Sequence, residues 1–179
     1  RSLWDWMIFV GSLIPALLWG VAMANLLYGI PIDANMNYVG GFFNLLNPYA
    51  LVGGITSLLI VTFHGSIFLT LKTSDQILES SRKFAKKLWL PSSLLVILFF
   101  IYGYFATDIF TRLGINPGPI PLIAIASILL SGYFLRIKRE GWAFVMTGIT
   151  IVFSTITLFM GLFPRVMVSS LNDKWSLTI

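Results

Sequence analysis

Long apolar stretches, separated by short polar ones, dominate this chain of 179 residues. A bilayer core about 30 Å thick is crossed by about 20 apolar residues in a helix. Five stretches are close to that length or longer, and they predict membrane-spanning helices over residues 3–30, 48–71, 89–107, 119–135 and 141–163. We therefore expect an all-α integral membrane protein, a bundle of about five transmembrane helices that forms a single transmembrane domain over residues 1–179.

Asparagine and proline residues mark where some of these helices begin and end. Asn47 is a favoured N-cap residue, and Pro48 occupies the first helical position, where the N–H that it lacks would have no partner. Pro91 falls in the first turn of the third predicted helix, and Pro164 follows the fifth. The second helix is therefore expected to start at Pro48.

The basic residues lie between the apolar stretches and predict an orientation. Cytoplasmic loops of membrane proteins carry an excess of Lys and Arg. Nine of the twelve basic residues fall on one side, in Arg1, the loop 72–88 and the turn 136–140. We expect this side to be cytoplasmic, which puts the tail after Pro164 outside. An aromatic belt is expected at the inner membrane interface and comprises Trp4, Trp6, Trp89 and Trp142.

The loop 72–88 itself has a helical pattern. Thr73 and Gln76 have the spacing of a capping box, and Glu79 and Lys83 have the i,i+4 spacing of an ion pair. One interpretation is an extension of the second helix whose lysines reach anionic headgroups. The other is a docking surface for a cytoplasmic partner.

Composition strengthens the membrane interpretation. Hydrophobic residues make up 57% of the chain and charged residues 11%, with a mean hydropathy of +0.87, whereas soluble domains carry about 25% charged residues. The net charge of +5 follows membrane topology, which argues against a nucleic-acid partner. The absence of cysteine excludes disulfides, thiolate metal sites and cysteine nucleophiles. No nucleophile elbow, Walker loop or dinucleotide fingerprint is present.

The single histidine, His64, lies inside the second predicted helix. It shares a helix face with Gly54, Ser57 and Val61, so we expect it to point into the bundle. An ionisable residue within a membrane is a functional hypothesis by default. Three roles are open: a hydrogen-bonded packing residue, a proton-transfer group, or a ligand of a metal or haem. A bis-histidine haem site would need its second histidine from another chain, and a methionine is the other possible partner.

Three further residues are candidate polar groups near the outer membrane surface. Asp108 lies at the outer end of the third predicted helix, and Arg112 follows at the i,i+4 spacing of a structural ion pair. The alternative for this pair is a role in proton movement at the outer surface. Arg165 follows Pro164, directly beyond the fifth helix.

Rows of small or hydroxylated residues run along two helices. Ala16, Gly20 and Ala24 form a small-xxx-small row in the first helix. The row in the fifth helix comprises Thr147, Thr150, Ser154, Thr157 and Gly161. Such rows are typical of faces where membrane helices approach closely, with hydroxyls bonding across or back to their own helix. A hydroxyl-lined substrate path is the alternative.

With so few ionisable groups inside the membrane, the residues alone favour an accessory subunit, a scaffold or a carrier of an apolar or uncharged solute. Several strings in order then resemble one family. They are Asp33-Ala34-Asn35-Met36, Tyr38-Val39-Gly40-Gly41, Asn47-Pro48-Tyr49-Ala50-Leu51-Val52-Gly53-Gly54, His64-Gly65, Leu71-Lys72-Thr73, Gly141-Trp142-Ala143-Phe144, Leu162-Phe163-Pro164-Arg165, Ser169-Ser170-Leu171 and Ser176-Leu177-Thr178. Together they resemble subunit II of the cytochrome bd-type quinol oxidases.

The resemblance implies a role in a terminal oxidase in the cytoplasmic membrane of bacteria or archaea. Such enzymes oxidise a quinol and reduce oxygen to water. The b-type and d-type haems and the quinol-oxidising loop belong to subunit I, and subunit II packs against it without binding haem. The resemblance therefore implies no catalytic, cofactor or metal residue in this chain. A small single-helix subunit, membrane lipid and a structural quinone are the further partners that it suggests.

Length is where the chain departs from this family, whose members are roughly twice as long. We therefore expect the five helices to be part of a larger subunit II-like bundle, with sequence missing at the front and also at the back. Two alternatives to the oxidase subunit are a multi-helix permease for an uncharged or apolar solute and an assembly or lipid-binding scaffold.

Overall fold

The computed structural model describes residues 2–108 and 118–179. Within these residues it contains five α-helices, which confirms the predicted all-α membrane fold. They are α1 (Ser2–Tyr28), α2 (Pro48–Lys72), α3 (Asp75–Ala106), α4 (Ile120–Arg136) and α5 (Glu140–Leu162). The short elements are the 3₁₀ turns η1 (Phe42–Leu45) and η2 (Asp173–Trp175) and the antiparallel strands β1 (Arg165–Met167) and β2 (Leu177–Thr178).

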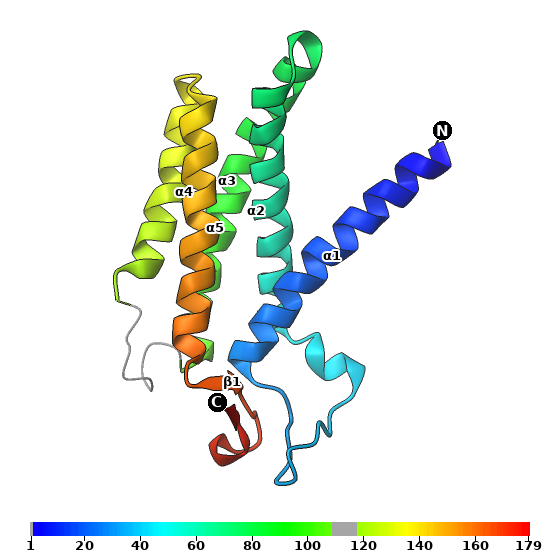
Figure 1. Ribbon diagram of the computed structural model, residues 1–179, viewed down its shortest axis with the longest axis vertical. Coiled ribbons are helices and arrows are strands. Elements are labelled where there is room, and N and C mark those ends of the chain that lie inside the picture. The colour runs from blue at the N-terminus through cyan, green and yellow to red at the C-terminus, as the bar shows by residue number, and fades with distance from the viewer. Residues whose placement is uncertain (1, 109–117) are drawn as a thin grey trace.

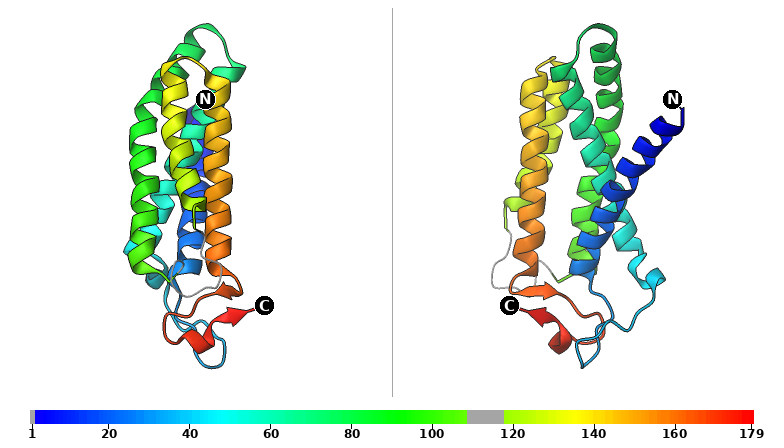
Figure 2. Two further views of the ribbon diagram at one scale, coloured as in Figure 1. Left: turned by 90° about the vertical axis from the view of Figure 1, so that its left-hand side faces the viewer. Right: turned by 45° about the vertical axis from the view of Figure 1, so that its right-hand side comes forward.

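Helices α2 to α5 run side by side as a bundle, and α1 leans away from it toward its N-terminal end (Figure 1). Among the described helices, α1, α2, α3 and α5 are long and apolar enough to cross a membrane, while α4 is apolar but has 17 residues. At ~1.5 Å per residue α4 is about 26 Å long. The connections α2–α3 and α4–α5 lie at one end, and the loop 29–47 and the C-terminal strands lie at the other (Figure 2).

Local signals placed the start of α2 correctly. The Asn47 side chain accepts a hydrogen bond from the backbone N–H of Ala50 at 2.8 Å, and α2 begins at Pro48. The Asn47 amide also donates to the Asn25 side chain at 2.8 Å, and Asn25 in turn donates to the carbonyl of Leu45 at 2.7 Å. The same residue that caps α2 therefore links it to the buried end of α1.

The structure corrects one interpretation of the segment 72–88, that it extends the second helix. It does not extend α2, because α2 ends at Lys72 and α3 begins at Asp75. The Thr73 hydroxyl donates to the carbonyl of Leu69 at 2.7 Å, and the N-cap of α3 is Ser74 without a side-chain cap bond, so the predicted capping box is not formed. Pro91 was predicted to lie in the first turn of the third helix, but it lies inside α3.

This longer α3 is held at its polar end by an ion-pair network. Arg82 Nε donates to Glu140 Oε1 at the start of α5 at 2.7 Å, and Arg82 Nη1 donates to Glu79 Oε1 at 2.6 Å. Glu79 was expected to pair with Lys83 but its partner is Arg82. At ~1.5 Å per residue, the 32 residues of α3 extend about 48 Å, well beyond the bilayer core of about 30 Å.

Small residues let the helices approach one another closely, as two contacts illustrate. Gly20 and Ala24 of the predicted row in α1 are buried against α2, where a Cβ atom on Gly20 would collide with the carbonyl of Gly53 and the side chain of Ser57. Gly132 of α4 makes room in the same way for the indole of Trp89 on α3. Close helix approach of this kind is how membrane helices gain packing contacts without a hydrophobic driving force.

Candidate functional site

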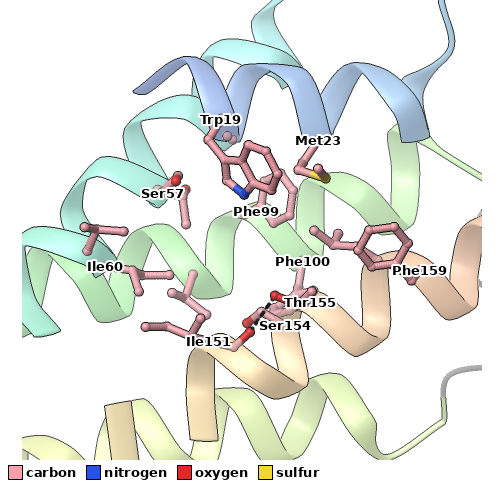
Figure 3. A pocket seen from close by; sticks show the side chains of 16 residues that line it. Trp19, Met23, Ser57, Ile60, Phe99, Phe100, Ile151, Ser154, Thr155 and Phe159 are labelled. Atoms are coloured by element: carbon pink, nitrogen blue, oxygen red, sulfur yellow. Dashed lines mark hydrogen bonds between the residues drawn. The ribbon is translucent and has the colours of Figure 1, made fainter. Parts of the chain in front are cut away.

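The divergence of α1 from the bundle leaves an apolar cleft between α1 and α5, with α2 and α3 as its floor (Figure 3). The cleft encloses about 200 Å³. Its side chains are mainly aromatic and aliphatic: Trp19, Met23, Ile60, Val61, Val96, Phe99, Phe100, Ile151, Leu158 and Phe159. A cleft of this character fits an apolar chain or ring.

One buried side-chain polar atom among the described residues of the cleft has no hydrogen-bond partner. The Ser154 Oγ of α5 is buried and finds none among the described residues. Both threonine hydroxyls of the lining are satisfied, since Thr155 Oγ1 donates to the carbonyl of Ile151 at 2.8 Å and Thr56 Oγ1 donates to that of Val52 at 2.7 Å. A buried hydroxyl left alone costs about 1–3 kcal/mol. Ser154 is therefore the point where a polar atom of a bound molecule would be stabilised.

The other hydroxyls of the fifth-helix row agree with a packing role. Thr150 Oγ1 donates to the carbonyl of Met146 at 3.0 Å and lies 3.3 Å from that of Ala124 on α4, and Thr157 donates to Phe153 at 2.8 Å. Both threonines are fully buried. The sequence analysis grouped Ser154 with the other residues of this row, and so it did not predict that the Ser154 hydroxyl lacks a hydrogen-bond partner.

His64 lies on α2 away from the cleft lining. Its Nδ1 atom is 2.7 Å from Thr147 Oγ1 on α5, and its ring is stacked on that of Phe144 with the centroids 4.3 Å apart. Thr147 Oγ1 donates its one proton to the carbonyl of Phe144 at 2.9 Å, so we assign the Nδ1 hydrogen to the bond with Thr147. The imidazole therefore joins α2 to α5 through a hydrogen bond and a ring contact.

His64 alone does not make a haem site. A six-coordinate b-type haem takes an axial ligand on each face, and His64 is the one histidine in a chain without cysteine, so the second ligand would be a methionine or would come from another chain. In residues 2–108 and 118–179 no group of three or more His, Cys, Asp or Glu side chains could hold a metal ion. We derive no step through a haem bound to this chain.

Asp108 and Arg165 form a bidentate ion pair at the opposite end from the Arg82 network. Arg165 Nη2 donates to Asp108 Oδ1 at 2.8 Å, and Nη1 donates to Oδ2 at 2.9 Å. The side chain of Arg165 is 11% exposed and that of Asp108 is 20% exposed. The pair ties the end of α3 to β1. Arg112, the partner expected for Asp108, lies outside the described residues, and the 57-residue separation from Arg165 hid this pair from sequence reasoning.

Comparisons with known proteins identify the family. The model of the family described as cytochrome bd terminal oxidase subunit II matches residues 1–179. The chain is 38% identical over 178 residues to cytochrome bd ubiquinol oxidase subunit 2 of Bacillus subtilis (strain 168), covering 99% of this chain and 53% of that protein.

Two further relatives agree. The chain is 32% identical to the probable cytochrome oxidase subunit 2 of Haemophilus influenzae, covering 99% of this chain and 55% of that protein. It is 29% identical to cytochrome bd-I ubiquinol oxidase subunit 2 of Escherichia coli (strain K12), covering 100% and 56%. The chain thus spans about half the length of the curated relatives it matches. It belongs to the family of cytochrome bd terminal oxidase subunit II.

Proposed function

We propose that this chain serves as the haem-free subunit II of a cytochrome bd-type quinol oxidase in a cytoplasmic membrane. The whole-chain family match carries the proposal. Quinol oxidation and oxygen reduction to water take place in a haem-bearing subunit I, and this chain supplies packing surface to it. A single histidine engaged with Thr147 and Phe144 supports the assignment of the haems to the partner.

The N-terminal half of α1 is a candidate surface for such packing. It is apolar and projects from the bundle (Figure 1), and Trp4, Trp6 and Ile8 are 67%, 65% and 69% exposed. A hydrophobic helix with this exposure is in contact with lipid or with another membrane helix.

The orientation that we propose puts the segment 72–88 inside and the tail after Pro164 outside. Labelling of a cysteine introduced at Lys138 from one side of sealed vesicles tests it.

The complex itself is tested by isolating the tagged chain in mild detergent and staining a native gel for haem. A haem-bearing membrane subunit is expected to migrate with this chain at fixed stoichiometry. A permease would instead purify without a haem-bearing companion and would transport its solute in vesicles. An assembly factor would be absent from the mature complex.

His64→Gln is expected to leave the haem content of the purified complex unchanged. The variant loses the stacked imidazole and the bond to Thr147, so we expect a loss of stability of about 1 kcal/mol. The measurement is the haem spectrum per complex together with the thermal midpoint. Loss of one haem with the midpoint unchanged would contradict the haem-free assignment.

We also propose that the α1–α5 cleft holds a lipid acyl chain or the ring of a structural quinone. The aromatic lining and the unpartnered Ser154 hydroxyl support this, because a quinone carbonyl would accept the hydrogen bond that Ser154 can donate.

Ser154→Leu, which fills the cleft, is expected to lower quinone per purified complex at least several-fold. Ser154→Ala, which removes the hydroxyl alone, is expected to lower it about five- to tenfold if the carbonyl is bound there, since a hydrogen bond contributes about 1 kcal/mol. Thr155→Ala on the neighbouring position is the matched control, because its hydroxyl is satisfied within α5. Equal quinone content in the wild-type complex and in all three variants would mean that the cleft does not hold a quinone.

A further inference from the structure

Positive charge is concentrated at the end of the bundle that holds the α2–α3 and α4–α5 connections (Figure 1). Its acidic side chains are Asp75, Glu79 and Glu140, and Arg82 engages both glutamates. The exposed basic side chains are Lys72, Lys83, Lys86, Lys87, Arg136, Lys138 and Arg139. None of these seven forms an ion pair within residues 2–108 and 118–179. Seven cations at this end therefore have no ion-pair partner among the described residues, and they would attract an anionic surface.

One of these cations, Arg136, lies over a fixed indole at the seam between α3 and α4. Trp89 Nε1 donates to the carbonyl of Ile128 on α4 at 3.0 Å, and the ring lies against Gly132. The guanidinium carbon of Arg136 is 5.2 Å from the centroid of the Trp89 ring. Lys86 is exposed and lies one turn before Trp89 on α3. Side chains on a helix lean toward its N-terminus, so the Trp89 ring leans toward Lys86. The indole thus holds Arg136, and helical spacing places Lys86 one turn away from it along α3.

Below these cations the seam is apolar and exposed. Leu90 and Leu94 continue the i,i+4 row from Lys86 and are 55% and 58% exposed. Tyr133 and Leu129 continue the corresponding row from Arg136 on α4 and are 57% and 43% exposed. The surface therefore presents cations at headgroup level and apolar side chains at acyl-chain level, with tryptophan at the boundary, as at a membrane interface.

We propose that Lys86 and Arg136 bind the phosphate of an anionic phospholipid whose acyl chains lie along the α3–α4 seam. Arg136 offers its planar N–H groups to the phosphate oxygens while its face stays on Trp89, and Lys86 adds a point charge. An acidic protein segment would match the charge but not the exposed leucines beneath it. This lipid site depends on the proposed function in one respect only, which is that the chain lies in a membrane.

The test is a lipid titration of the delipidated, detergent-purified complex, read by native mass spectrometry. Dioleoylphosphatidylglycerol and dioleoylphosphatidylcholine are compared on the wild-type complex, on Lys86→Gln/Arg136→Gln and on a control, Lys138→Gln/Arg139→Gln. The control removes the same charge from the tip of the α4–α5 turn. We expect the phosphatidylglycerol affinity to fall about 30-fold in the first variant, since each basic residue near an anionic surface contributes a factor of about five. The control is expected to change by less than about threefold.

Three results would overturn the site. Equal losses in both double variants would mean diffuse attraction without a site. Equal binding of the two lipids to the wild-type complex would mean that charge plays no part. Unchanged lipid binding with loss of an acidic protein chain from the Lys86→Gln/Arg136→Gln complex would mean a protein partner. Lys86→Arg, which keeps the charge and leaves Arg136 on Trp89, is expected to retain most binding and guards against misfolding. Purification without haem would instead contradict the proposed function, and the titration would remain readable.

Discussion

Gly20→Val is expected to abolish the docking of α1 on α2 and to reduce the folded complex recovered from membranes at least tenfold. The Cβ atom of any residue at position 20 would meet the backbone carbonyl of Gly53, which cannot rotate away as a side chain can. The helices would have to separate, which would open the buried contacts around Ala24. Overpacking of a tight interface costs about 1–3 kcal/mol, and a backbone clash belongs at the upper end or above.

Gly11→Val is the matched control on the same helix. No atom lies within 4 Å of a Cβ built on Gly11, and the residue is exposed. Both substitutions place the same β-branched residue in α1, so the difference between them isolates the contact with α2. Recovery on a native gel and the thermal midpoint of the complex are the measurements. Equal recovery of the two variants would mean that the approach of Gly20 to Gly53 does not hold α1 in place.

How far the fold could be predicted depended on how local its causes are. The start of α2 follows from Asn47 and Pro48, whose effects act within one turn, and the prediction was right. The predicted start of the third helix at residue 89 was wrong. It rested on Pro91 as a typical first-turn residue, whereas Pro91 lies inside a helix that begins at Asp75. The contact of Arg82 with Glu140, 58 residues further along the chain, fixes those first turns and is not visible in local pattern.

The tilt of α1 could not be predicted for a different reason. A helix that is apolar on all sides gives no preferred face, and its small-residue row shows only where another helix can approach. Gly20 and Ala24 identified the contact, but the divergence beyond Trp19 that forms the cleft depends on the shape of α2 and α5. The cleft was therefore absent from the sequence analysis, although several of its residues had been singled out.

Asp108→Asn is expected to destabilise the complex by about 2–3 kcal/mol. The substitution leaves Arg165 largely buried without its bidentate partner. Breaking a fully buried pair from one side costs about 3–5 kcal/mol, and the 20% exposure of Asp108 lowers that figure. Thermal unfolding of the purified complex is the measurement. Glu79→Gln is the control, because the Glu79 side chain is 57% exposed and a surface pair contributes little.

Two further variants separate the pair from the other contacts of Asp108. In a double-mutant cycle, Asp108→Asn/Arg165→Gln is expected to be about 1–2 kcal/mol more stable than the sum of the single changes predicts, since no charge is then left buried alone. Arg165→Lys keeps the charge but cannot form two parallel bonds to the carboxylate, so it is expected to retain less than half of the coupling. Strict additivity would mean that the pair does not hold the end of α3 to β1. If lysine instead matches arginine, the charge at this position stabilises this end of the bundle, and the two parallel hydrogen bonds of arginine do not add to it.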